Sequence, residues 1–253
     1  MKNSIIIANW KMNPATYGEA EKLVSNLLPG ITRNKKTKVV LCPPFVWLNS
    51  LSSKFKKSIS FGAQDVFWKD GGPYTGEVSP QMLKSSGVNY VILGHSERKI
   101  YLGETDEMIN KKLKAALEAG LIPVLCVGEK ERNSDGIPAV VGEQLKNALG
   151  GIGKNLVKKL VVAYEPVWAI STMPGAKADS PDNAFRALVF IRKILAGLYG
   201  RKTAEGIKII YGGSVSSANI AGFLKEGKME GALVGGASMD AQEFLKVVRA
   251  AGR

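Results

Sequence analysis

Eight short apolar runs, rich in β-branched residues, recur along the whole chain. They read SIIIANW, KVVLC, SISFGAQ, YVILG, IPVLCVG, LVVAYE, IKIIYGG and GALVGG. Their apolar character is continuous rather than alternating, as expected of parallel strands that are covered on both faces. Helical patterns separate them, and this repeated alternation predicts a (β/α)8 barrel. The alternative is an open doubly wound sheet, which usually has fewer strands and a glycine-rich first turn, whereas the first turn here reads NWKMNP.

Two of the intervening helices have clear sequence boundaries. One is predicted at residues 181–198, with Ser180 as its N-cap and Pro181 at its first position. Its predicted apolar stripe consists of Ala184, Leu188, Ile191, Leu195 and Leu198. The other is predicted at residues 104–119, acidic in its first turn and stopped by Gly120.

The length of 253 residues suits one barrel, so we expect a single domain over residues 1–253. Apolar residues make up 45% of the chain and charged residues 23%, which is typical of a soluble globular protein. No apolar run reaches the roughly 18 residues that a membrane span needs. The start MKNSIIIANWKMN has too short an apolar run for a secretory signal. We therefore expect a cytoplasmic protein.

The chain is strongly basic, with 35 Lys and Arg against 22 Asp and Glu and a net charge of +13. Such an excess raises the possibility of nucleic acid as a partner. The lysines, however, lie in the short groups RNKKTK, KFKK, NKKLK and VKKL, without interleaved aromatic residues. A solvated basic surface that weakly steers small anions is the favoured interpretation, and we do not expect nucleic-acid binding.

Cysteine and histidine are too scarce for common metal sites. Cys42 and Cys126 each lie inside an apolar run, which predicts buried free thiols rather than a disulfide. His95 is the single histidine, so a site with two histidine ligands is excluded. We expect neither a metal nor another cofactor.

Chemically apt residues follow several of the predicted strands. A barrel gathers the carboxyl ends of all its strands on one face, where active sites form. The residues at these ends are Asn9, Lys11, His95, Glu97 and Glu165, with Gly213, Ser214, Gly235 and Gly236 after the last two strands. Backbone N–H groups at glycines can approach a phosphate closely. This arrangement predicts an active site with a phosphate-binding part.

At these residues the chain resembles the triosephosphate isomerase family over essentially its whole length. The motifs ANWKMN, AQD, YTGE, GHSER, CVGE, YEPVWAI, YGGSV and LVGGAS occur in that family's order. The resemblance implies reversible interconversion of dihydroxyacetone phosphate and D-glyceraldehyde 3-phosphate by proton abstraction through an enediolate. It implies Glu165 as the base and neutral His95 as the electrophile; the helix that we expect to open at Ser96 also disfavours a charged imidazole there.

Further roles are implied by the same resemblance. Lys11 supplies a fixed charge near the developing oxyanion, Asn9 hydrogen-bonds the same region, and Glu97 is a polar partner close to the base. Ser171, in the sixth loop, adds its N–H to the substrate phosphate when that loop closes. The third connection inserts into a partner subunit, so we expect a homodimer through residues 65–77, with Tyr74 and Thr75 at the interface.

Some residues near these motifs are expected to hold the architecture rather than to touch substrate. We interpret Glu129 and Arg98 as members of charge pairs, and Gln64 and Asp65 as structural. The sixth loop departs from the family: Ser171 and Met173 replace glycines, a few residues are added, and Lys99 stands where arginine is common. We hypothesise that Pro174 and Gly175 form a replaced hinge.

Two other functions fit parts of the sequence. The first is another phosphate-binding barrel, such as an aldolase or a different sugar-phosphate isomerase. A Schiff-base enzyme would need a lysine in the barrel, commonly on the sixth strand, where this chain has Glu165. The second is a non-catalytic basic protein that holds nucleic acid or a phosphosugar, which would not need Lys11, His95 and Glu165 together.

Overall fold

A computed structural model describes residues 4–132 and 136–252, and in this part of the chain eight parallel strands close into a barrel. The strands are β1 (Ser4–Asn9), β2 (Thr37–Cys42), β3 (Ser60–Ala63), β4 (Tyr90–Leu93), β5 (Ile122–Val127), β6 (Val161–Tyr164), β7 (Lys208–Tyr211) and β8 (Gly231–Val234). Each strand pairs with the next in sequence, and β1 also pairs with β8, with Ile7 opposite Leu233. This closure confirms the predicted barrel and excludes the open sheet.

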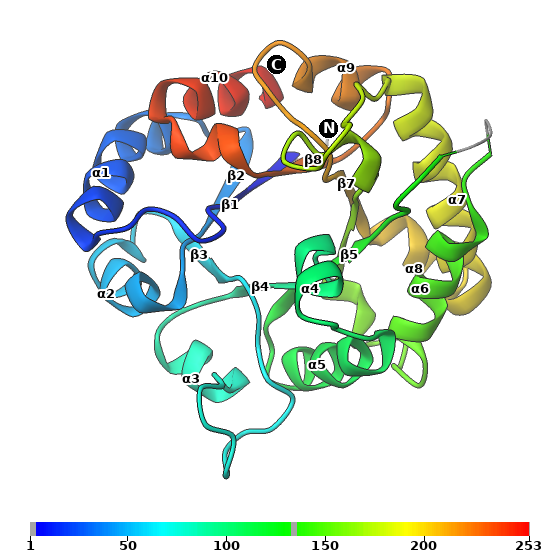
Figure 1. The fold of residues 1–253 in the computed structure, drawn as a ribbon, viewed down its shortest axis with the longest axis horizontal. Coiled ribbons are helices and arrows are strands. Elements are labelled where there is room, and N and C mark those ends of the chain that lie inside the picture. The colour runs from blue at the N-terminus through cyan, green and yellow to red at the C-terminus, as the bar shows by residue number, and fades with distance from the viewer. Residues whose placement is uncertain (1–3, 133–135, 253) are drawn as a thin grey trace.

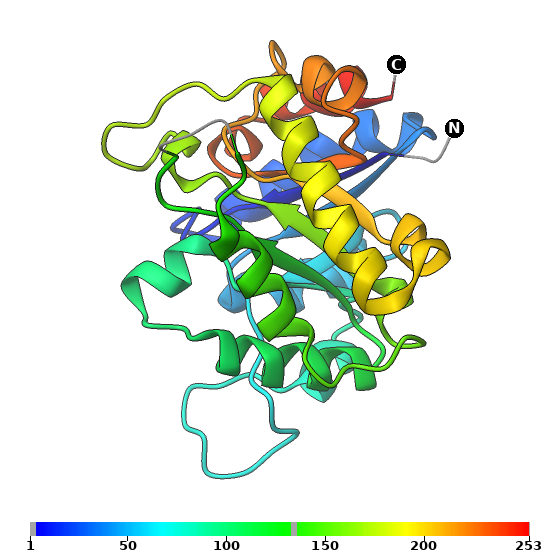
Figure 2. The same cartoon turned by 90° about the vertical axis from the view of Figure 1, so that its right-hand side faces the viewer.

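Helices surround the barrel on all sides (Figure 1). They are α1 (Tyr17–Arg33), α2 (Phe45–Phe55), α3 (Pro80–Ser85), α4 (Ser96–Tyr101), α5 (Asp106–Glu118), α6 (Ala139–Leu149), α7 (Pro181–Tyr199), α8 (Arg201–Gly206), α9 (Ile220–Lys225) and α10 (Ala241–Ala251). Three 3-10 turns, η1 (Val157–Lys159), η2 (Val167–Ala169) and η3 (Gly236–Met239), lie in the connections. The segment between β3 and α3 projects away from the rest of the fold (Figures 1 and 2).

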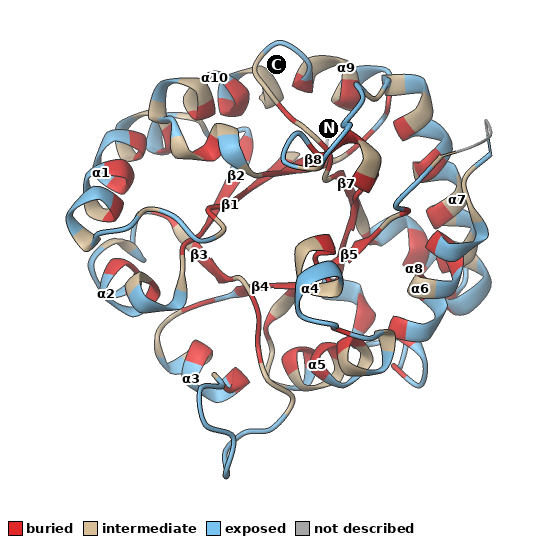
Figure 3. Ribbon diagram, viewed as in Figure 1, coloured by how far each residue is buried: buried red, intermediate tan, exposed pale blue. Residues whose placement is uncertain are grey.

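The strands are buried on both faces, which explains their continuous apolar sequences (Figure 3). The faces that point into the barrel form one cluster, which includes Ile7, Val40 and Ile92. The opposite faces pack with the helices in a second, larger cluster that includes Trp10, Leu41 and Phe244. The barrel interior is therefore a packed core, and a ligand must bind at one of its ends.

The predicted helix at residues 181–198 is confirmed as α7, but its buried stripe differs from the predicted one. Leu188 is only half-buried, whereas Ala187 is buried. Ser180 caps it by accepting a hydrogen bond from the Asn183 N–H at 3.2 Å. Leu198 is 44% exposed, whereas Tyr199 is buried. The helix continues one residue further than predicted, and the Tyr199 hydroxyl donates to the Leu149 carbonyl at 3.2 Å. The prediction that Leu198 belongs to the buried stripe is wrong, because Tyr199 fills that place.

The second predicted helix begins later than expected. The N-cap of α5 is Thr105, so the helix begins after Glu104, the first residue of the predicted helix. The Thr105 hydroxyl accepts a hydrogen bond from the Met108 N–H at 3.3 Å. Glu104 precedes this cap and is buried in an ion pair with Lys112. The short helix α4 lies between β4 and α5. Pairing with a buried lysine, rather than helix propensity, decides where Glu104 lies.

Both cysteines are buried and unpaired, as predicted. Burial raises the pKa of the Cys42 thiol, and burial together with the nearby Glu165 carboxylate raises the pKa of Cys126. Both thiols therefore stay protonated at neutral pH. Separately, no helix within the described ranges combines the length and hydropathy that a membrane crossing requires.

Candidate active site

The carboxyl ends of the strands surround a small pocket of about 80 Å³. The predicted site residues that line it are Asn9, Lys11, His95, Glu165, Ser171, Gly213, Ser214, Gly235 and Gly236. Glu97 is absent from the lining but contacts Lys11 behind it. Segments that follow five different strands thus meet at one mouth of the barrel, because all the strands run in the same direction.

Glu165 directly follows β6 and is only 2% exposed. Its backbone N–H donates to the Val127 carbonyl at 2.8 Å, which extends the pairing of β6 with β5 by one residue. Its Oε2 accepts a hydrogen bond from the Ser96 N–H at 3.0 Å. Its Oε1 lies 3.1 Å from His95 Nε2 but has no aligned hydrogen bond to any described residue. One carboxylate oxygen is therefore held in place while the other keeps a free lone pair.

His95 is the N-cap of α4 and is 7% exposed. Its Nδ1 accepts a hydrogen bond from the Glu97 N–H at 3.3 Å. A ring nitrogen that accepts a hydrogen bond carries no proton, so this contact favours a neutral imidazole with its proton on Nε2. The helix N-terminus favours the same form, because its partial positive charge opposes an imidazolium. His95 consequently presents one N–H donor beside Glu165.

Lys11 is held by contacts on both its backbone and its side chain. Its φ of 53° places it in the left-handed region, and its N–H donates to Asn9 Oδ1 at 3.0 Å. Gln64 Nε2 donates to the Lys11 carbonyl at 2.8 Å, which gives Gln64 a structural role, as expected. The Lys11 ammonium pairs with Glu97 Oε1 at 2.5 Å and donates to Thr172 Oγ1 at 3.3 Å. The charge is thereby fixed at the pocket.

The far side of the pocket is made of backbone donors. Among the described residues, the N–H groups of Gly213, Gly235 and Gly236 make no hydrogen bond. The Ser171 N–H donates to Ser214 Oγ at 2.7 Å, and the Ser214 N–H donates to the Ala169 carbonyl at 3.2 Å. Free N–H groups at a glycine-rich turn are suited to binding an anion.

The segment after Glu165 is fastened at both of its ends. At the start, the Trp168 indole N–H donates to Glu129 Oε1 at 3.0 Å. At the end, the Tyr211 hydroxyl donates to Asp179 Oδ2 at 3.0 Å; burial raises the pKa of both groups. Between them Gly175 has a φ of 70°, within a turn closed by the Ala176 N–H and the Met173 carbonyl at 3.3 Å. The glycine that we expected to be a flexible joint thus occupies a conformation that favours glycine.

The charge pairs expected to support the site are present. Arg98 pairs with Asp65 at 2.7 Å, and Arg132 pairs with Glu129 at 2.5 Å. The Tyr164 hydroxyl also donates to Glu129 Oε1, at 2.8 Å. Burial, followed by the Glu129 charge, raises the pKa of Tyr164, so this phenol remains a donor. These contacts join β5, β6 and the start of the sixth loop.

Three residues of the site were not singled out from the sequence. The Ser96 N–H orients Glu165, Thr172 contacts Lys11, and Gly212 packs against the Glu165 side chain. Ser96 and Gly212 lie inside motifs already recognised, GHSER and YGGSV, so the signal was present. No sequence motif marked Thr172, because its contact with Lys11 depends on how the sixth loop folds over the barrel.

Gly212 leaves the space that Glu165 occupies. A Cβ at this position would lie 2.7 Å from Glu165 Cγ and 3.1 Å from the Tyr164 carbonyl. Gly212→Ala should displace the carboxylate and lower kcat by about 10- to 100-fold with a smaller change in KM. Steady-state isomerase kinetics test this, with Gly197→Ala as control, since a Cβ at Gly197 meets nothing within 4 Å. Equal kcat values for the two variants would contradict the packing argument.

Comparisons with known proteins agree with this geometry. The family model described as triosephosphate isomerase matches residues 4–251. The chain belongs to the triosephosphate isomerase family. It is 47% identical to the triosephosphate isomerase of Caldanaerobacter subterraneus subsp. tengcongensis over 98% of this chain and 99% of the relative. It is 47% identical to that of Moorella thermoacetica, over 98% of both chains, and 44% identical to that of Dictyoglomus thermophilum, over 98% of this chain and all of the relative.

Membership in the triosephosphate isomerase family rests on the whole barrel and not on a local motif, because the match runs from β1 to α10. It assigns the chain to this family rather than to the aldolases or another phosphate-binding barrel. Within the described residues, no group of three or more His, Cys, Asp and Glu side chains is arranged to hold a metal ion.

Proposed function

We propose that this chain is a triosephosphate isomerase that interconverts dihydroxyacetone phosphate and D-glyceraldehyde 3-phosphate. One observation carries the proposal: the free Oε1 of buried Glu165 lies 3.1 Å from Nε2 of neutral His95. A base and a hydrogen-bond donor side by side are what proton transfer next to a carbonyl requires. The family match supports the same activity.

Glu165 is the base that moves the proton. Its Oε1 takes a proton from the carbon next to the substrate carbonyl, so a C–H bond breaks and an O–H bond forms on the carboxylate. The electron pair moves into an enediolate, whose remaining hydroxyl proton passes from that oxygen to the former carbonyl oxygen. The same carboxyl group then returns the carbon-derived proton to the neighbouring carbon. A positioned base contributes about 10²- to 10⁴-fold to a rate.

His95, Lys11 and Asn9 stabilise the enediolate. His95 donates its Nε2–H to the substrate oxygens, and the Lys11 ammonium places a positive charge near the oxyanion. Asn9 Oδ1 accepts the hydrogen bond from the Lys11 N–H, so the Asn9 amide NH2 group can donate to substrate. Glu97 holds the Lys11 ammonium through their 2.5 Å ion pair and completes this set.

The substrate phosphate binds to backbone N–H groups. Gly213, Gly235 and Gly236 offer unused donors. The Ser214 N–H joins them once it leaves the Ala169 carbonyl. Ser171 contributes its N–H when the sixth loop closes, and to do so it exchanges its bond to Ser214 Oγ for the phosphate. Closure excludes water, which strengthens these interactions and protects the enediolate.

A coupled assay of isomerisation tests the proposal. The purified chain is supplied with D-glyceraldehyde 3-phosphate, and the dihydroxyacetone phosphate formed is reduced by a coupling dehydrogenase with consumption of NADH. We expect turnover without added metal or cofactor. Absence of turnover would favour the alternative of a non-catalytic basic binding protein on the same scaffold.

We further propose that the enzyme is a cytoplasmic homodimer assembled through residues 65–77. Support comes from the projecting third connection, whose tip, including Thr75, is exposed (Figure 3). Tyr74 is 39% exposed and lies 4.7 Å from Phe67, ring to ring. Met12, next to catalytic Lys11, is 93% exposed, so a large apolar side chain lies open beside the site.

Sedimentation at micromolar concentration tests the dimer. We expect twice the chain mass, and Thr75→Arg should shift the mass toward the monomer because it adds a bulky charge to the interface. An exposed control, Thr32→Arg, should leave the mass unchanged. A wild-type monomer with full activity would overturn this proposal without affecting the isomerase assignment.

A further inference from the structure

Two basic segments that the isomerase site does not use meet at the opposite end of the barrel. Residues 33–38 read RNKKTK and residues 54–57 read KFKK. The first lies between α1 and the start of β2, and the second at the end of α2, shortly before β3. Since β2 and β3 are neighbours, both segments lie at the amino ends of these strands, away from the active site.

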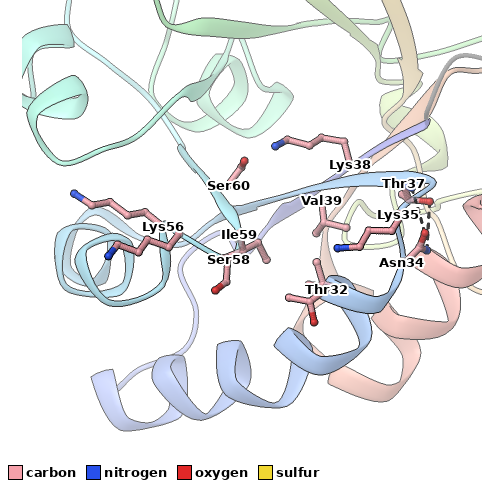
Figure 4. A pocket seen from close by; sticks show the side chains of 12 residues that line it. Thr32, Asn34, Lys35, Thr37, Lys38, Val39, Lys56, Ser58, Ile59 and Ser60 are labelled. Carbon is pink, nitrogen blue, oxygen red and sulfur yellow. Dashed lines mark hydrogen bonds between the residues drawn. The ribbon is translucent and has the colours of Figure 1, made fainter.

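A cavity of about 560 Å³ lies between the two segments. Its lining consists of Ile31, Thr32, Asn34, Lys35, Thr37, Lys38, Val39, Lys56, Lys57, Ser58, Ile59 and Ser60. Lys35 and Lys38 stand on one side and Lys56 on the other, with Ser58 and Ser60 between them (Figure 4). Four lysines and no carboxylate line the hollow, so its electrostatic potential is positive.

The four lysine charges are uncompensated. In the described ranges, no carboxylate lies within ion-pair distance of Lys35, Lys38, Lys56 or Lys57, and all four are exposed. Lys54, in the same KFKK group, behaves differently, because it pairs with Glu21 at 2.8 Å. Like charges gathered around a concave surface repel one another, and a bound anion relieves that repulsion.

Neutral donors complete the lining. In the pairing of β2 with β3, Val40 lies opposite Ser60, the first residue of β3. Residues 37–39 of β2 therefore extend past the start of β3 and have no strand partner on the β3 side. The hydroxyls of Ser58 and Ser60 make no hydrogen bond to any described residue. The long, exposed lysine stems can turn their ammonium groups into the hollow.

We propose that this cavity is a second anion site, which binds a small molecule carrying several phosphate groups. Its volume falls in the range of small-ligand pockets, roughly 300 to 1,000 Å³. The active site offers backbone N–H groups and one lysine, which suit a single phosphate. Four ammonium groups on exposed side chains suit a chain of phosphates with three or four negative charges. Inorganic polyphosphate and nucleoside triphosphates share this chemistry.

Calorimetric titration with inorganic tripolyphosphate tests the site. The pocket variant combines Lys35→Gln, Lys38→Gln, Lys56→Gln and Lys57→Gln. The control variant combines Lys154→Gln, Lys158→Gln, Lys159→Gln and Lys202→Gln, which removes the same charge from exposed lysines outside the lining. We expect Kd to rise by roughly tenfold or more in the pocket variant and to change little in the control.

Acetylation of lysines, read by mass spectrometry, locates the bound anion. Tripolyphosphate should protect Lys35, Lys38, Lys56 and Lys57 in the wild type more than Lys154 or Lys202. A parallel titration with adenosine triphosphate distinguishes inorganic polyphosphate from a nucleoside triphosphate as the ligand. If adenosine triphosphate binds more tightly than tripolyphosphate does, the cavity also contacts the nucleoside. Retained isomerase turnover of both variants, together with native circular dichroism, shows that they are folded.

Three results would overturn the second site. No binding of tripolyphosphate to the wild type at about 1 mM is the first, because specific sites for such anions bind more tightly. Equal loss of affinity in the pocket and control variants is the second, and it would indicate a diffuse basic surface. Unchanged affinity in the pocket variant is the third, and it would place the anion outside this cavity.

Discussion

Replacing Glu165 with glutamine should lower kcat of the isomerase by about 10²- to 10⁴-fold. The amide has nearly the same shape and can still lie in the 2%-exposed position beside the Ser96 N–H. It has no basic oxygen to take a proton from carbon, so the loss falls on the chemical step. KM should change little, because the N–H groups of Gly235 and Gly236, the proposed phosphate donors, are untouched.

Two measurements make this result specific to the base. Glu118→Gln, at an exposed carboxylate at the end of α5, should leave kcat unchanged. Exchange of the substrate's carbon-bound hydrogen with deuterated water should slow in Glu165→Gln in parallel with kcat. Undiminished turnover or exchange in this variant would show that another group carries the proton, and the assignment of Glu165 would be wrong.

The largest effect on stability is expected for Lys112→Met, at about 3–5 kcal/mol of the free energy of unfolding. Lys112 donates to both carboxylate oxygens of Asp65 at 2.8 Å and also pairs with Glu104. Removing the ammonium leaves two buried carboxylates with only Arg98 as a cation. Urea unfolding at neutral pH measures the change.

The neighbouring pair provides a matched control. Lys111 contacts Glu107 at 2.7 Å on the exposed face of the same helix, and such pairs contribute about 0.3–0.5 kcal/mol. Lys111→Met should therefore change the unfolding free energy far less than Lys112→Met. Similar losses in the two variants would show that burial does not set the strength of the Asp65 cluster.

The stability deficit of Lys112→Met should also depend on pH. Burial raises the pKa of Asp65, and the Lys112 charge opposes that rise. Without Lys112 the folded chain binds a proton at Asp65 more readily than the unfolded chain does. The free energy of unfolding of Lys112→Met then increases as pH is lowered through that raised pKa. Its difference from the free energy of unfolding of the wild type therefore becomes smaller.

Much of the barrel was predictable because its physical requirements act locally. A parallel strand covered on both faces must be apolar throughout, so each of the eight runs marked a strand. The N-cap of α7 was equally readable, since Ser180 and Pro181 satisfy the helix terminus by themselves. Leu198 was misplaced because helix periodicity does not say whether Tyr199 or its neighbour fills the space beside Leu149.

The supporting contacts of the site were less readable. Glu104 looked like the first turn of a helix, but its burial with Lys112 depends on how α5 lies against the barrel. Thr172 reaches Lys11 across 161 residues, through the path of the sixth loop. The sequence showed that this loop departs from the family at Ser171 and Met173, while its fastening by Asp179 to Tyr211 required coordinates.

The sequence by itself determined the barrel, the order of its strands and the residues at their carboxyl ends, because these follow from local apolarity and from the direction of the strands. Tertiary structure alone decided which oxygen of Glu165 is free, which nitrogen of His95 carries the proton, and that two separate lysine groups border one cavity. Those properties arise from contacts between residues far apart in the chain. Distances across the closed barrel set them, and no local pattern encodes such distances.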